Sequence, residues 1–304
     1  QDRNNDTFAR RDKMKLMGFD TDDGEDERAL LPMTDNFAQP IITPKGDRVV
    51  FTNVHKKEVY VVDWEGKTLK PLAKGVAAEV WMDPETGIEW VYIQVGEGRI
   101  GRDYKKNPIW RCQLDKPKVQ NLVWDASGVD IVRYSSFCLS ADGKRAGGAF
   151  PWNHCGVADM EAGTWEVMGR GCWASLAPDN SYLFWHFDGP HRHVYMYPAD
   201  GSESWMVDIN TFEGCEPRHE VYHPRWSNHV RFMTLTGPYR RHGNPSFEEG
   251  AKVEIQMGRF APDMKSIEAW ITVSRNDRAD FYPDAWIEPA GLSIAVEKPP
   301  EPKP

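Results

Sequence analysis

A phrase that joins a short apolar strand to a tight turn recurs six times along this chain of 304 residues. The glycines of its first and last copies, Gly46 and Gly291, are 245 positions apart, so the repeat averages about 49 residues. A repeat of this length is typical of solenoids and propellers, and it constrains the fold more than any other feature. The six turns are residues 44–46, 84–87, 141–143, 178–180, 226–228 and 289–291.

A second set of turns lies between the first, and strand-like residues flank each of them. These turns are residues 64–66, 115–117, 161–163, 199–201 and 261–263. Two hairpins per repeat predict a four-stranded antiparallel meander, which is the blade of a β-propeller. We therefore predict an all-β propeller of six four-stranded blades. Five or seven blades stay open, because the second and fifth repeats are long.

The two ends of the chain are predicted to complete the last blade together. The sixth repeat stops soon after Val296, whereas residues 15–31 contain a strand, a turn and a second strand. Strands from both termini in one sheet would close the ring and remove its exposed edges. The predicted organisation is an N-terminal extension over residues 1–12, a single propeller domain over 13–297 and a Pro-rich tail or linker over 298–304, beyond which further domains are an option.

The repeat also carries a family resemblance. Residues 42–51, with the turn Pro44-Lys45-Gly46 at their centre, resemble the repeat of TolB-type propellers, and residues 59–66 are similar to the second half of such a blade. The resemblance covers about residues 13–297 and implies a fold rather than an activity, because such propellers serve as binding platforms, peptidase lids and polysaccharide lyases. The sequence has no Gly-x-Ser-x-Gly motif, which argues against a peptidase.

Charge and hydropathy exclude two classes of protein. The chain carries 37 basic and 46 acidic side chains, and its net charge of −9 repels a nucleic-acid backbone. No stretch approaches the roughly 18 apolar residues of a membrane helix. We therefore expect neither a nucleic-acid partner nor a membrane span.

The start of the chain and its cysteines bear on location. The chain begins at Gln1 without an apolar signal segment, which fits a cleaved signal peptide or a trimmed chain. Five cysteines cannot all pair, and Cys172 and Cys215 are the two that could meet. We predict a secreted or periplasmic protein.

Most of the histidines are predicted to lie on one face of the ring. In a propeller, the loop between the second and third strands of each blade shares a face with the link to the next blade, and ligands usually bind there. Six of the nine histidines fall in such loops or links, namely His55, His154, His191, His193, His219 and His242. A basic, histidine-rich face on a protein of net charge −9 suggests an anionic ligand.

Two neighbouring loops of this face repeat one another. Gly189-Pro190 leads to His193, and Gly237-Pro238 leads to His242 in the next repeat. The side chains predicted to contact the ligand are His154, Trp152, Arg192, His219, Arg240, Arg241, His242 and Arg102.

Three functions are compatible with this face. In the first, one divalent metal ion is bound by His191, His193 and His242, although His191-x-His193 is the only close-spaced pair and the cofactor is otherwise unknown. In the second, the protein is a polysaccharide lyase, whose β-elimination needs a base and a cation against a uronate carboxylate. Its candidate catalytic residues are His193, His223, Arg225, Tyr222 and Tyr239, and strand alternation predicts that His223 and Arg225 point to the same side.

In the third function the face binds a glycan without cleaving it. Aromatic rings stack on sugars, and the candidates are Trp152, Trp173, Trp185 and Trp226. The alternative from a different class is a non-catalytic protein-interaction module of a larger cell-envelope protein. Such a module should expose a broad apolar patch, whereas a glycan site should be concave and aromatic.

Overall fold

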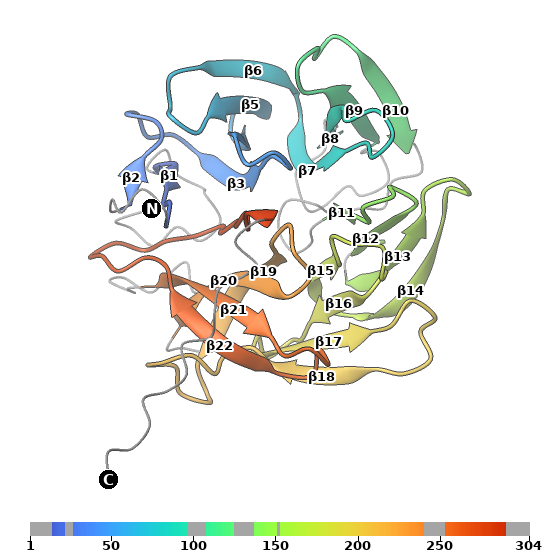
Figure 1. Cartoon of the computed structure of the whole chain (residues 1–304), viewed down its shortest axis with the longest axis vertical. Coiled ribbons are helices and arrows are strands. Elements are labelled where there is room, and N and C mark those ends of the chain that lie inside the picture. The colour runs from blue at the N-terminus through green and yellow to red at the C-terminus, as the bar shows by residue number, and fades with distance from the viewer. Residues whose placement is uncertain are drawn as a thin grey trace.

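Five four-stranded antiparallel sheets surround a central axis in the computed structural model, which gives an all-β propeller (Figure 1). The structure describes residues 14–21, 27–95, 108–124, 137–150, 153–239 and 253–289. Every named element within these ranges is a strand. None of the described residues forms a helix long and apolar enough to span a membrane.

Each blade is a meander whose first strand is innermost. Blade one comprises β3 (Phe37–Ile42), β4 (Arg48–Asn53), β5 (Glu58–Asp63) and β6 (Leu69–Lys74). Blade two comprises β7 (Val76–Met82), β8 (Glu89–Gln94), β9 (Ile109–Gln113) and β10 (Gln120–Trp124). Blade three comprises β11 (Cys138–Leu139), β12 (Arg145–Ala149), β13 (His154–Asp159) and β14 (Thr164–Arg170). Blade four comprises β15 (Cys172–Leu176), β16 (Phe184–Phe187), β17 (His193–Tyr197) and β18 (Trp205–Asp208), and blade five comprises β19 (Glu220–Trp226), β20 (Phe232–Tyr239), β21 (Glu254–Phe260) and β22 (Ile267–Thr272).

Burial falls from the axis outward. In blade one, β4 is buried on both faces because neighbouring blades cover it, whereas most of β6 is exposed. Between blades four and five, the rings of Trp185 and Trp226 stack with centroids 3.7 Å apart. These two tryptophans are therefore packing residues, and their rings are not available to stack on a sugar.

The predicted hairpins are confirmed, but the predicted count of six blades is wrong. The turn glycines Gly46, Gly66 and Gly143 all adopt positive φ, as tight hairpin turns require. The described residues after β22 form no further sheet, because residues 273–289 contain no named strand and are joined to blade five by isolated backbone hydrogen bonds, such as that from the Val273 amide to the Ile255 carbonyl. The sixth turn signal, residues 289–291, lies almost wholly outside the described residues.

The described segments nearest to the two ends of the chain nevertheless lie between blades five and one (Figure 1). At the N-terminal end, β1 (Met17–Gly18) pairs with β2 (Arg28–Ala29) as a separate two-stranded hairpin. Near the C-terminal end, the chain returns toward the middle of the ring, where the Ile42 amide donates to Asp284 Oδ2 at 2.7 Å. The expected closure is therefore made by a small hairpin and an extended segment, without a sixth four-stranded sheet.

Trp286 of this extended segment makes the same contact as Trp81 of the innermost strand of blade two. In blade two, Trp81 Nε1 donates to the carbonyl of Ala141 at 3.0 Å, which holds the first turn of blade three. Trp286 Nε1 donates in the same way to the carbonyl of Pro44 at 3.0 Å, in the first turn of blade one. The segment 279–287 therefore takes the place that the innermost strand of a sixth blade would have.

Candidate functional site

The innermost strands carry irregularities at one end of the axis. The pairing register shifts between Ala38 and Ile41 in blade one, between Cys172 and Ser175 in blade four, and between Tyr222 and Arg225 in blade five. An extra residue in a strand is a β-bulge, which bends the strand and redirects its side chain. The bulges make room for prolines 40 and 224 in β3 and β19, because a bulge leaves an amide unpaired.

The bulges hold non-glycine residues in the left-handed region. Gln39, Trp173 and His223 have φ values of 49°, 44° and 55°, and Tyr282 in the extended segment has 55°. Each such residue costs of the order of 1–3 kcal/mol, and residues of this kind cluster at functional sites. We call Gln39, Trp173, His223 and Tyr282 the bulge ring.

Members of the bulge ring touch one another across blade boundaries. The ring centroids of Trp173 and His223 are 5.4 Å apart, and those of His223 and Tyr282 are 4.5 Å apart. Trp173, His223 and Tyr282 are 6%, 5% and 9% exposed, so only a small part of each residue reaches the surface. The bulge ring thus joins blades four and five and the extended segment.

Burial sets the protonation of His223. Burial, followed by the neighbouring His191, lowers the pKa of His223 to about 3. The imidazole is therefore uncharged at neutral pH, where it can donate or accept a hydrogen bond. It is a weak base, because a base with a pKa far below the working pH gains little by taking a proton.

Tyr222 and Tyr239 lie beside the bulge ring. Their ring centroids are 4.8 Å apart, and Tyr222 donates its hydroxyl hydrogen to Glu220 Oε2 at 2.9 Å. Burial first, and then the charge of Glu220, raise the pKa of Tyr222. The structure thus brings together three of the predicted catalytic residues, His223, Tyr222 and Tyr239.

Arg225 lies in a separate cluster on the axis. Its Nε is 3.0 Å from Asp284 Oδ1, and its Nη2 is 3.6 Å from Glu79 Oε1. Blades two and five are not neighbours, so β7 and β19 meet only across the middle of the ring. The bulge at residues 223–224 also breaks the strand alternation from which His223 and Arg225 were predicted to share a side.

His193 is held by two carboxylates away from the bulge ring. Its Nδ1 is 2.7 Å from Asp188 Oδ2, and its Nε2 is 3.2 Å from Asp208 Oδ1. Asp188 also accepts hydrogen bonds from the amides of Arg192 and His193, which ties together the two ends of the β16–β17 loop. Both ring nitrogens are engaged, which fixes the imidazole at the start of β17.

The remaining predicted ligand-binding residues divide into two groups. Among the described ones, Arg192 Nη1 donates to the carbonyl of Pro217, the ring of His219 accepts from the Glu216 amide, and His154 begins β13 opposite Arg170. The others lie outside the described residues: Arg102, Trp152, Arg240, Arg241 and His242.

The predicted metal set is only partly described. Outside the undescribed loops, no group of three His, Cys, Asp or Glu side chains is placed to hold a metal ion. The ring of His191 stacks on Phe187, with centroids 4.9 Å apart and an interplanar angle of 13°. His191 and His193 therefore have different surroundings in the structure.

Comparisons with known proteins give a fold and no activity. No family model matches the chain, and no curated protein matches it. Among solved structures, a protein of Agrobacterium tumefaciens assigned as TolB is 13% identical, with a TM-score of 0.53, and the match covers 86% of this chain and 89% of that one. The fold is that of the TolB-type propellers.

Two enzymes are more distant in structure. An oligogalacturonate lyase from Vibrio parahaemolyticus is 14% identical with a TM-score of 0.44, and the match covers 76% of this chain and 64% of that one. A luciferin-regenerating enzyme is 11% identical with a TM-score of 0.47, covering 78% and 80% of the two chains. At these values neither enzyme says what this propeller does.

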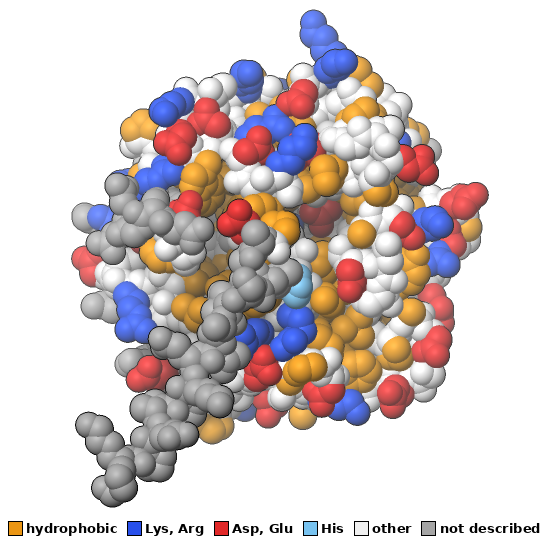
Figure 2. Space-filling view, in the orientation of Figure 1, with side chains coloured by type: hydrophobic (Ala, Val, Ile, Leu, Met, Phe, Trp, Pro, Cys, Tyr) orange, Lys and Arg blue, Asp and Glu red, His pale blue; other side chains and the backbone are white. Residues whose placement is uncertain are grey.

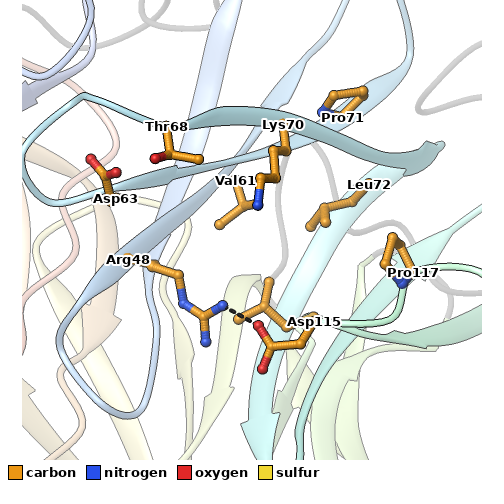
Figure 3. Close-up of a pocket in the computed structure, with 10 residues that line it drawn as sticks. Arg48, Val61, Asp63, Thr68, Lys70, Pro71, Leu72, Asp115 and Pro117 are labelled. Carbon is orange, nitrogen blue, oxygen red and sulfur yellow. Dashed lines mark hydrogen bonds and ion pairs between the residues drawn. The ribbon is translucent and has the colours of Figure 1, made fainter.

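A second feature of the propeller lies on the opposite face, between blades one and two. A pocket of about 270 Å³ is lined by Arg48, Val61, Asp63, Thr68, Lys70, Pro71, Leu72, Leu114, Asp115 and Pro117 (Figure 3). Arg48 donates to Asp115 and to the buried carboxylate of Glu89, both at 2.5 Å. Its guanidinium is therefore neutralised, and the lining contains no aromatic ring.

Sequence reasoning missed Gln39 and Tyr282 of the bulge ring. A signal was present, because Gln39, His223 and Tyr282 each precede a proline. The two carboxylates on the axis could also have been found, since Glu79-x-Trp81 and Asp284-x-Trp286 share the pattern of an acidic residue two positions before a tryptophan. Which of these side chains meet depends on the closure of the ring.

Proposed function

We propose that this TolB-type propeller is a glycan-binding protein whose bulge ring contacts the sugar. The observation that carries the proposal is the left-handed backbone at Gln39, Trp173, His223 and Tyr282. Backbone strain is costly, and residues that carry it cluster at functional sites, where it helps to place their side chains. Aromatic edges beside a neutral imidazole and an amide supply both the apolar contact and the hydrogen bonds that a sugar takes.

The charges on the axis favour a neutral sugar over an acidic one. Arg225 is the cation nearest the bulge ring along β19, and it lies between Glu79 and Asp284. One guanidinium against two carboxylates gives no excess positive charge for a uronate. A uronate would therefore be repelled unless a proton neutralised one of the two carboxylates.

Binding is better supported than cleavage. A pKa near 3 makes His223 a poor acceptor for the C5 proton of a uronate. Both nitrogens of His193 already face carboxylates. Arg225 is paired, and so the cation that β-elimination needs is not free either. Lyase activity is therefore kept as an alternative outcome of the experiment described below.

The protein-interaction alternative has less support from the surface. Large exposed hydrophobic side chains lie on the outermost strands of all five blades, namely Leu69, Leu122, Trp165, Val167, Met206 and Ile271. Among the described residues, these six side chains are therefore distributed over five different blades. On the face shown in Figure 2, acidic and basic side chains are likewise interspersed around the rim. A secreted or periplasmic location remains our prediction from the sequence.

The test uses a substitution that should spare the backbone. Asparagine tolerates a left-handed φ better than histidine does, so His223→Asn should keep the fold while removing the imidazole. We expect the unmodified protein to bind neutral oligosaccharides on a glycan array, and His223→Asn to weaken that binding by about tenfold in calorimetry, or about 1.4 kcal/mol.

Two controls make this test decisive. Lys57→Gly relieves the same kind of strain at φ 47° in a loop of blade one, and should leave glycan affinity unchanged. An array without any bound glycan, or equal affinities for His223→Asn and the unmodified protein, would refute the proposal. Formation of unsaturated products from a uronate polymer would establish the lyase function in its place.

A further inference from the structure

A thiol, an imidazole and a carboxylate are aligned where blades four and five meet. Cys172 Sγ is 3.6 Å from His191 Nε2, and His191 Nδ1 is 3.6 Å from Glu220 Oε2. The three residues come from the start of β15, the β16–β17 loop and the start of β19. This order of groups is that of an activated cysteine: a nucleophile, a base and a group that orients the base.

The fold fixes the position of the imidazole. The His191 carbonyl accepts a hydrogen bond from the Val221 amide at 2.9 Å, so the loop of blade four is tied to β19 of blade five. His191 has a φ of 58°, and Trp173, next to the cysteine, has one of 44°. The backbone is thus strained at His191 and at Trp173, the residue that follows Cys172.

We infer that Cys172 and His191 form a nucleophilic thiol–imidazole pair, with Glu220 as its positioning residue, which adds to small carbonyl electrophiles. In this step the thiol proton moves to His191 Nε2 and a bond forms between Sγ and the carbonyl carbon. The π-electron pair of the carbonyl moves onto its oxygen, which then takes the proton from His191. The addition needs no oxidant, reductant or other co-reactant.

The surroundings of Cys172 make the base necessary. Burial raises the pKa of the Cys172 thiol, and the nearby Cys155 and Asp188 raise it further. The resting thiol is therefore protonated, and the thiolate arises only when His191 takes the proton. Cys172 is 7% exposed and the side chain of His191 is 20% exposed, so only a small reagent, approaching from the side of His191, would reach the thiol.

Two other cysteines serve as internal references. Cys215 is more exposed than Cys172, and its Sγ lies 3.9 Å from the Glu216 carbonyl. Cys155 is buried, and its Sγ lies 3.9 Å from the Asn153 carbonyl. If exposure alone governed reactivity, Cys215 would react first. If the imidazole governs it, Cys172 reacts first.

The test is competitive alkylation of the intact, folded protein with iodoacetamide. Here Sγ displaces iodide, the carbon–iodine bond breaks with its electron pair, and the thiol proton passes to His191. Peptide mass spectrometry follows each cysteine over time, and we expect Cys172 to be labelled before Cys215 and Cys155. Labelling of Cys215 ahead of Cys172 would overturn the inference.

Variants separate activation from access. His191→Asn suits the left-handed φ at this position, and it should slow labelling of Cys172 by about a hundredfold while Cys215 is unaffected. Glu220→Gln should slow it less, and Glu220→Asp should restore part of the rate. His186→Gln, at a buried histidine outside the pair, should change nothing. An unchanged Cys172 rate in His191→Asn would also overturn the inference, and the glycan-binding result does not bear on it.

Discussion

At the scale of single residues, the axis shows how burial changes the meaning of a charge. The sequence predicts Arg225 as a cation for an acidic ligand, yet in the structure it is paired with Asp284 and Glu79. Burial raises the pKa of Glu79 to about 7 in spite of Arg225. The folded protein therefore binds a proton at Glu79 more tightly than the unfolded chain does.

A dependence of stability on pH follows from this raised pKa. The contribution of Glu79 to stability is fully present below its unfolded pKa, near 4.5, and is lost as pH rises through about 7. The loss amounts to at most about 3 kcal/mol. Glu79→Gln should therefore melt at a higher temperature than the unmodified protein at pH 8, and the two should converge near pH 4.5 in calorimetry. A constant difference at all pH values would contradict this assignment.

At the scale of elements, two junctions of the ring are held by an indole that packs on a turn glycine. Gly46 has a φ of 76°, and a Cβ there would lie 2.7 Å from the ring of Trp286. Gly143 repeats the arrangement with Trp81 at 2.7 Å. The glycine thus serves both the turn and the close approach of an indole from the preceding inner strand.

Gly87 provides a matched control for this contact. It has a φ of 68°, and a Cβ would meet nothing within 4 Å. Gly87→Ala should cost about 1 kcal/mol of unfolding free energy from backbone strain alone. Gly46→Ala should cost a further 1–3 kcal/mol or so, because the indole must move. Equal losses in denaturant unfolding would show that the Trp286 contact is not tight.

At the scale of the whole molecule, ring closure depends on residues near both ends of the chain. The largest hydrophobic cluster includes Leu16 and Leu30 beside the β1–β2 hairpin and Phe281 of the extended segment, packed with residues of blades one, four and five. Ending the chain at residue 278 would remove Phe281, Asp284 and Trp286 together. We expect this truncation to lower the melting temperature by several degrees more than Trp286→Ala does, because several buried groups are lost at once. Equal melting temperatures would mean that Trp286 alone makes the closure.

The sequence by itself determined the blade, because hairpin turns and alternating strands are set by neighbours a few residues apart. The repeat length, the turn glycines and the likeness to TolB-type propellers followed from it. Only the tertiary structure decided that there are five full blades, and that Trp173, His223 and Tyr282 meet. It also decided that Arg225 is neutralised and that Cys172 faces His191. Most of these contacts join one blade to another or to the extended segment, and the Cys172–His191 contact joins two parts of blade four that are 19 residues apart in the sequence. Their partners are set by the packing of the whole ring, which no local pattern encodes.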